Sequence, residues 1–114
     1  MKVTKQIENR IEKIKQLKKE ENIRMLVEVR EYAKKMKKIV KDFPNADYVT
    51  LAFYNKAIET IKLTNKLIRA LKNSKKSNAE IIEKHRETTR KIIDNVDFLK
   101  EHEIQMRIGF FEFF

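Results

Sequence analysis

The side chains that could carry out acid–base or metal chemistry in this 114-residue chain are few and far apart in the sequence. There are two histidines, His85 and His102, and no cysteine. Neither histidine has an acidic residue three positions before it, so the Glu-x-x-His pattern of metal sites in helical bundles is missing. No glycine-rich phosphate loop and no nucleophile elbow occurs, and Ser74 and Ser77 lie in a polar stretch without a partner base. The sequence therefore predicts a protein that is not an enzyme and that holds no metal or other cofactor.

Lysine and arginine are the residues whose number and spacing indicate a chemical role. The net charge is +10, and it is spread unevenly: residues 1–41 carry 14 basic and 6 acidic side chains, residues 42–77 carry 7 and 3, and residues 78–114 carry 6 and 8. Five basic residues recur at intervals that place them on one side of a helix: Arg30, Lys34, Lys37, Lys38 and Lys41. The segment AKKMKKIVK at 33–41 contains no acidic residue at all.

A second group of lysines lies in and before a polar loop, at Lys72, Lys75 and Lys76. Antiparallel packing of the flanking helices would bring this group near Lys13, Lys15, Lys18 and Lys19. The two groups together predict a basic strip that contacts the phosphate backbone of nucleic acid, DNA or RNA, without reading its sequence, because no base-reading motif accompanies them. The alternative is that the lysines only coat a solvated surface. A membrane-surface role is disfavoured because the chain lacks the exposed aromatic face that such helices need.

The elements that must position these lysines are helices. One Gly, one Pro and 39% charged residues leave few turn-forming positions, which favours an all-α fold. Apolar residues recur at helical spacing over 5–43, over about 47–73 and from about 78 to Gly109, where the single glycine is expected to cap the last helix. Pro44 ends the first segment, and Asn45 or Asp47 is expected to cap the second.

The third segment begins with a capping box, in which the Ser77 oxygen accepts a backbone N–H and Glu80 reaches back. Three such segments predict an antiparallel three-helix bundle. The apolar pattern is interrupted at KKEEN, 18–22, and because no Gly or Pro lies there we expect one continuous first helix. Such a helix of about 38 residues would be about 57 Å long. A homodimer, or a break near residue 20 that yields a four-helix bundle, is therefore the alternative expectation.

The buried faces of the helices follow from the same spacing. The first helix should bury Leu26, Val29, Ala33, Met36, Val40 and Phe43. The second should bury Leu51, Tyr54, Ile58, Ile61, Ile68 and Leu71. The third should bury Ile82, His85, Thr89, Ile92, Val96, Leu99 and Met106. On this pattern His85 is expected to be a hydrogen-bonded histidine of the core or of an interface.

The composition also bears on where the protein works. No segment approaches the ~20 apolar residues of a membrane span, so we expect a soluble, cytoplasmic protein. Lys, Glu and Ile number 20, 13 and 14. Such Lys and Glu enrichment is typical of hyperthermophiles, although an AT-rich genome produces a similar bias.

The chain ends in GFFEFF, residues 109–114, which resembles the sliding-clamp binding motif found at the C-termini of archaeal replication and repair proteins. This motif, the PCNA-interacting peptide or PIP box, occurs there in forms such as TLFDFF. The resemblance implies that Phe110 takes the aliphatic position, Phe111 and Glu112 the two intervening positions, and Phe113 and Phe114 the aromatic pair that enters an apolar pocket on the clamp. The first position of the motif, usually Gln, falls on Arg107.

The sequence thus divides into a helical bundle at 1–108 and a C-terminal aromatic peptide at 109–114. We expect a non-enzymatic accessory factor of DNA replication or repair that holds the DNA backbone or a polymerase subunit through its basic face and a sliding clamp through its tail. Two alternatives remain. The protein could be a helical small subunit of an RNA-guided defence complex, or a mobile-element inhibitor or immunity protein whose Phe tail packs in the core.

Overall fold

The computed structural model describes residues 2–41 and 47–112, and these residues form helices and their connections without a strand. The five helices are α1 (Lys2–Lys15), α2 (Lys19–Val40), α3 (Tyr48–Asn73), α4 (Asn78–Lys84) and α5 (Arg86–Glu112). The prediction of an all-α fold is confirmed. The predicted count of three or four helices is wrong, because the first and the third predicted segments are each divided in two. Within the described ranges, every helix is too short or too polar to cross a membrane.

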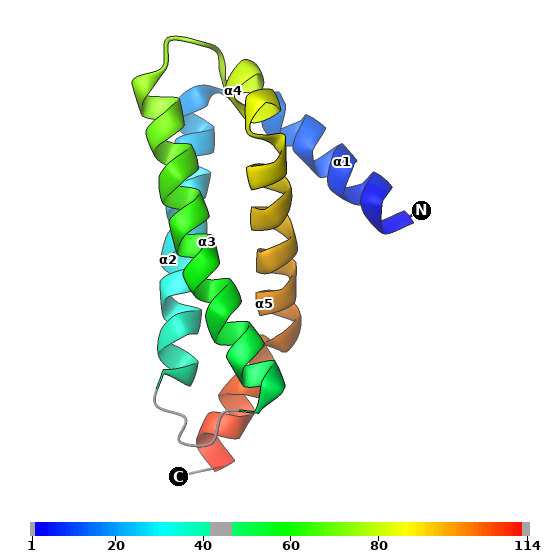
Figure 1. The fold of residues 1–114 in the computed structure, drawn as a ribbon, viewed down its shortest axis with the longest axis vertical. Coiled ribbons are helices and arrows are strands. Elements are labelled where there is room, and N and C mark those ends of the chain that lie inside the picture. Colours follow the sequence, from blue (N-terminus) through cyan, green and yellow to red (C-terminus); the bar gives the residue numbers. More distant parts are fainter. Residues whose placement is uncertain (1, 42–46, 113–114) are drawn as a thin grey trace.

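Three of the helices form the body of the molecule. α2 and α3 run antiparallel, and α5 returns beside α3 and also contacts α2 (Figure 1). α4 comes just before α5 in the chain and lies at the end of the body where α2 begins. α1 extends away from this end and packs against α4 and α5. The chain as a whole is long and flat, with extents of 50 × 33 × 18 Å.

The first predicted helix ends at Lys15 and a new helix starts at Lys19, so the expectation of one continuous helix is wrong. The break lies a few residues before the alternative position near residue 20. At the end of α1 the backbone tightens, since Leu17 N–H donates to the carbonyl of Ile14 at 3.1 Å. Lys18 then adopts an extended conformation, with φ −67° and ψ 151°. The reason for this break is a contact from a distant residue, Asn78, whose side-chain amide donates to the carbonyl oxygens of Ile14 and Leu17 at 2.8 and 3.0 Å.

The third predicted helix bends at His85, which has φ −109° and ψ 36° and ends α4. Backbone hydrogen bonds flank the bend, from His85 N–H to Ile81 and from Thr89 N–H to His85. The bend also moves His85 out of the core. Its side chain is half-buried, and the hydroxyl of Thr89 donates to the backbone carbonyl of His85, at 3.0 Å, and not to the ring. The core alternative of that expectation is therefore wrong, and the alternative of an interface histidine stays a prediction.

The predicted starts of α3 and α4 are confirmed by their caps. The Asp47 carboxylate accepts the backbone N–H of Thr50 at 2.7 Å, and this bond holds the pKa of Asp47 below its usual value. The Ser77 hydroxyl oxygen accepts the backbone N–H of Glu80 at 3.2 Å and donates to the Glu80 carboxylate at 3.3 Å. Local signals of this kind are visible in the sequence because the cap and its partner are three residues apart.

The core consists of two clusters along the body. One lies near α1 and α4 and includes Ile11, Leu67, Leu71 and Ile82, and the other lies at the opposite end and includes Met36, Phe53 and Leu99. Most of the predicted core residues of α2 and α5 are buried there. Phe43 lies outside the described residues.

On α3 the predicted core residues Ile68 and Leu71 are buried, whereas the rest of the predicted buried face is displaced around the helix. Leu51 is half exposed, whereas Phe53, Ala57, Thr60 and Thr64 are completely buried. Burial leaves the threonine hydroxyls hydrogen-bonded, because they donate to backbone carbonyls one turn earlier, Thr60 to Lys56 at 2.7 Å and Thr64 to Thr60 at 2.8 Å. Small side chains on this face let α3 lie against both α2 and α5.

Gly109 does not end the last helix, because the helical backbone continues to Glu112. The expected glycine cap is therefore wrong. None of the described residues, glycine included, has a positive φ.

Candidate nucleic-acid interface

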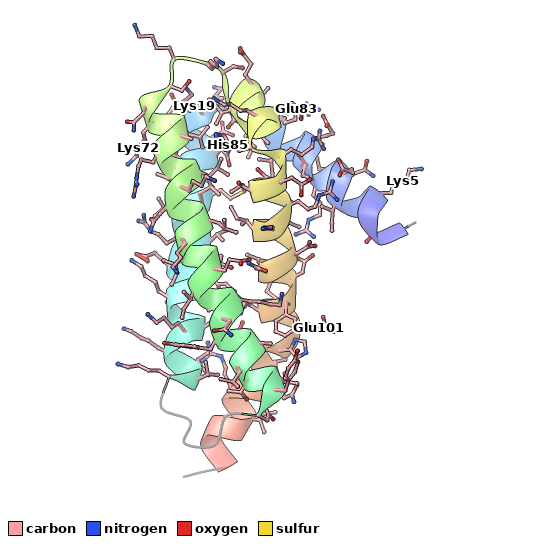
Figure 2. The ribbon with its side chains drawn as sticks, viewed as in Figure 1. Lys5, Lys19, Lys72, Glu83, His85 and Glu101 are labelled. Carbon is pink, nitrogen blue, oxygen red and sulfur yellow. The ribbon has the colours of Figure 1, made fainter. Side chains whose placement is uncertain are left out.

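Lysines from two distant stretches of the chain, 15–19 and 75–76, gather at the end of the molecule where α2 begins and α3 ends. Lys15, Lys18, Lys19, Lys75 and Lys76 line one open depression of about 540 Å³ between the α1–α2 turn and the loop after α3. Glu20 lines it as well. Figure 2 shows Lys19 and Lys72 toward this end. The predicted approach of the loop lysines to the group at 13–19 is therefore found for these five side chains, while Lys13 and Lys72 are exposed nearby and do not line the depression.

The five lysines differ in how far they are already engaged. The Lys19 ammonium donates to the carbonyl oxygen of Ser74 at 2.8 Å and so ties the α1–α2 turn to the loop. Lys15 lies 3.4 Å from the Glu12 carboxylate and 3.6 Å from that of Glu83. Lys18, Lys75 and Lys76 are exposed and form no ion pair with the described residues. We name these three exposed side chains the loop-end lysines.

The backbone around the depression adds to its positive potential. Lys18 caps α2 without a side-chain hydrogen bond, unlike the residues that cap α3 and α4. The first N–H groups of α2 therefore carry their partial positive charge toward this end, offset in part by Glu20 and Glu21 in the first turn.

The second predicted group, on α2, is reduced by its surroundings. Arg30 points toward α3, donates to the Asn65 side-chain oxygen at 2.8 Å and has its Nε buried, so it is not a free surface cation. Lys34 pairs with Glu31 at 3.3 Å. Lys37 is half-buried, and Lys38 and Lys41 are exposed. The structure thus separates Arg30 from the basic strip, and the remaining lysines lie along the outer surface of α2.

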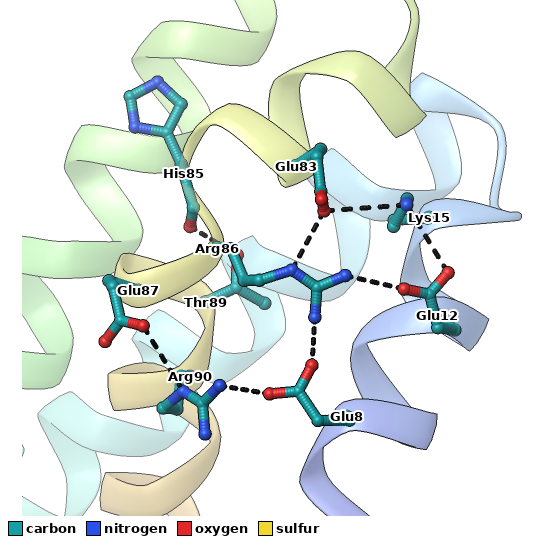
Figure 3. A network of polar contacts seen from close by, with 9 residues as sticks. All are labelled: Glu8, Glu12, Lys15, Glu83, His85, Arg86, Glu87, Thr89 and Arg90. Carbon is teal, nitrogen blue, oxygen red and sulfur yellow. Dashed lines mark hydrogen bonds and ion pairs between the residues drawn. The ribbon is translucent and has the colours of Figure 1, made fainter.

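A network of ion pairs that fastens α1 to the body was not predicted. Arg86, just after the bend, contacts Glu8, Glu12 at 2.6 Å and Glu83 at 2.9 Å, and Arg90 contacts Glu8 as well (Figure 3). Only the pairs three residues apart, of Arg86 with Glu83 and of Arg90 with Glu87, are visible in the sequence. The cross-helix pairs join residues more than 70 positions apart, for which the sequence holds no signal. Beside them, Arg10 makes two hydrogen bonds to Asp97, at 2.7 and 3.0 Å.

The two histidines are not brought together. Burial and the charges of Lys66 and Lys84 lower the pKa of His85. His102 stacks on Phe98 with 4.2 Å between ring centroids, and its Nδ1 lies 3.0 Å from the Phe98 carbonyl oxygen. Among the described residues, no three His, Cys, Asp or Glu side chains gather closely enough to hold a metal ion.

The end of α5 carries exposed apolar side chains beside the aromatic tail. Ile104 is 71% exposed and Ile108 is 53% exposed, whereas Met106 between them is buried. Both isoleucines fall outside the helical spacing that buries Val96, Leu99 and Met106, and this departure is the sequence signal that could have revealed them. Arg107, at the first position of the clamp motif, pairs with Glu103 at 2.9 Å.

The aromatic residues of that motif are only partly within reach of the structure. The backbone is helical at Phe110 and Phe111, but their side chains and the whole of Phe113 and Phe114 lie outside the described residues. Comparison with protein families, with curated proteins and with solved structures finds no match to this chain. The chemistry of its surfaces is therefore the basis for a functional proposal.

Proposed function

We propose that this protein is a non-enzymatic accessory factor that binds the phosphate backbone of nucleic acid with its lysine-rich end and recruits a protein partner with the end of α5. The observation that carries the first half is the gathering of five lysines from two distant stretches of the chain, 15–19 and 75–76, around one depression. Like charges repel, so a cluster of this kind costs stability unless an anion occupies it. Phosphate groups are the anions that such ammonium clusters bind in nucleic acids.

The chemistry of the cluster favours backbone contacts over base contacts. Lysine offers a flexible point charge and no planar pair of donors that could read a base edge. The depression is open, which suits an extended strand running over it. Binding is therefore expected to be independent of sequence, to decrease steeply with salt, and to extend along Lys34, Lys38 and Lys41 on α2 if the site is long.

Charge reversal of the loop-end lysines tests this half. The triple variant Lys18→Glu, Lys75→Glu and Lys76→Glu should bind a fluorescent oligonucleotide much more weakly, and the slope of log K against log salt should fall by about 3, near one unit for each lost phosphate contact. Single-stranded and duplex DNA and RNA of several sequences should be affected alike.

A matched control separates position from total charge. Lys5, Lys62 and Lys91 are exposed and lie away from the depression, and reversing all three changes the net charge by the same amount. This variant should retain most of the affinity and nearly all of the salt slope. Equal losses in the two triple variants would remove the depression from the mechanism and leave only a diffuse effect of net charge.

The second half of the proposal assigns the aromatic tail to a sliding clamp. It rests on the resemblance of GFFEFF to the clamp-binding peptide and is supported by the exposure of Ile104 and Ile108 on α5, just before the tail in the sequence. Exposed apolar side chains that continue one another mark protein interaction sites. A clamp is the partner proposed because the tail places aromatic residues at the positions that enter its pocket.

A further inference from the structure

We propose that α1 is an exchangeable arm, and that two copies of this chain form a homodimer in which each α1 packs against α4 and α5 of the other copy. In this dimer α1 would continue directly into α2 as one helix. The surface that receives the arm is already complementary to it, because it binds the same helix within a single chain. Exchange of an identical element therefore needs no new contact surface.

Local sequence preference favours the continuous helix. Residues 13–21, KIKQLKKEE, contain no Gly or Pro, and they consist almost entirely of Lys, Gln, Leu and Glu, which are good helix formers. The break at 16–18 is imposed from outside by the side-chain amide of Asn78 and by the bond from Lys19 to Ser74. Local preference and tertiary contacts thus oppose each other at this turn. A short connection under such a conflict promotes domain swapping.

The arm is attached by a separable set of contacts. Ile7 and Ile11 are buried in the core cluster next to α4, and the ion pairs of Arg86, Arg90 and Arg10 surround them. The body retains its own core cluster at the far end, formed by α2, α3 and α5 without any residue of α1. The arm can therefore leave as a unit while α2, α3 and α5 keep each other folded.

The asparagine pair Asn22 and Asn78 stabilises the closed form, in which α1 folds back at the turn and packs on its own chain. Asn22 is fully buried, and its amide donates to the Asn78 side-chain oxygen at 2.7 Å. The Asn22 side-chain oxygen has no hydrogen-bond partner and is buried, so the closed turn contains one unsatisfied polar atom. This atom is a cost that the closed form carries, and it lies one turn from the hinge.

A proline at residue 19 separates the two forms. Lys18 is extended, the conformation that a residue before proline prefers, and Lys19 is the first residue of α2, where proline fits. In the continuous helix the same proline would lie in the interior and clash with the carbonyl four residues earlier. Lys19→Pro is therefore compatible with the monomer and opposed to the exchanged dimer. Lys19→Ala is the matched control, since it also removes the bond to Ser74 but permits the continuous helix.

The test begins with unfolding and refolding the full chain at about 1 mM, followed by size-exclusion chromatography with light scattering. The wild-type chain and Lys19→Ala should yield a species of twice the 13.8 kDa of one chain. Lys19→Pro should lower the association constant of the dimer at least about 100-fold. A wild-type chain that stays monomeric under these conditions would overturn the proposal. So would a dimer that persists in Lys19→Pro.

A second experiment leaves the hinge unchanged and distinguishes exchange from side-by-side association. One variant carries Glu8→Lys and Glu12→Lys on the arm, and the other carries Arg86→Glu and Arg90→Glu on the body, so each arm repels its own body and matches the body of the other variant. Refolding the two variants together should give a 1:1 heterodimer. Each variant refolded alone should give much less dimer than the mixture. A mixture that yields no more dimer than the separate variants would contradict the exchange.

Discussion

The hydrogen bonds of Asn78 should account for a large part of the stability of the α1–α2 turn. Asn78 is 5% exposed and belongs to α4, yet its amide donates to the carbonyls of Ile14 and Leu17, and its oxygen accepts from fully buried Asn22. Asn78→Ala removes these three bonds, together with a longer one of 3.5 Å to the carbonyl of Lys15. The two carbonyls lie at a partly exposed turn and regain water, whereas the Asn22 amide is left buried without a partner.

The expected loss follows from these environments. A buried donor without a partner costs about 1–3 kcal/mol, and the two solvated carbonyls add about 0.5 kcal/mol each. Alanine recovers about 0.5 kcal/mol of helix propensity. The free energy of unfolding should therefore fall by roughly 1.5–3.5 kcal/mol, which lowers Tm by roughly 6–14 °C for a chain of this size.

Urea unfolding followed by circular dichroism at 222 nm measures this loss. Protein concentration is kept low, so that the monomer is the species observed. Asn73→Ala is the control, because Asn73 is an exposed asparagine at the end of α3, and it should change stability by less than about 0.5 kcal/mol. In the double variant with Asn22→Ala, the loss should be smaller than the sum of the single losses. A loss below about 0.5 kcal/mol for Asn78→Ala, or strict additivity, would refute the view that this amide holds the turn.

Three further predictions concern the core, the pH dependence and the tail. Phe53→Ala should destabilise the protein by about 3–5 kcal/mol because Phe53 is fully buried, whereas Tyr48→Ala, at a residue 87% exposed, should cost under about 0.5 kcal/mol; equal losses in urea unfolding would contradict the core described above. The pKa of His85 is lowered in the folded state, so its contribution to the free energy of unfolding is present above the ordinary pKa of 6.5 and is lost as the pH falls below that value. His85→Gln should therefore reduce the decrease of the urea midpoint between pH 7.5 and pH 5.5. An unchanged decrease would show that other groups cause it. Deleting residues 110–114 should leave helicity and Tm nearly unchanged and abolish clamp binding, and a peptide spanning 103–114 should bind the clamp alone by titration; a large loss of Tm together with a peptide that does not bind would exclude the clamp proposal.

The proline and the paired charge variants at α1 test the exchange separately from nucleic-acid binding. Their readout is mass, whereas that of the loop-end lysines is affinity and its salt dependence. A chain that binds nucleic acid but stays monomeric would support the nucleic-acid proposal and contradict the exchange of α1. A chain that dimerises but does not bind nucleic acid would do the opposite.

Features that depend on residues within one helical turn of each other could be predicted from the sequence. The all-α class follows from composition and apolar spacing, and the starts of α3 and α4 follow from Asp47 and Ser77, whose partners are three residues away. The excess of lysine in the first two thirds of the chain is likewise a property of the sequence. The approach of Lys75 and Lys76 to the lysines before α2 could be predicted because antiparallel helices with short loops bring such ends together.

The points at which the long apolar segments divide depend on contacts between distant residues, and local spacing does not reveal them. The turn at 16–18 contains good helix formers, and it exists because Asn78, about 60 residues later, offers its amide to the last carbonyls of α1. The buried face of α3 was also beyond the sequence pattern, since Thr60 and Thr64 satisfy their hydroxyls on the preceding turn and so enter the core in place of larger apolar residues. Arg30 does not belong to the basic strip because it donates to Asn65 on α3, a partner that the residue spacing within α2 does not reveal. Local preference sets which segments are helical, but contacts between distant residues outweigh it wherever a buried polar group must find a partner.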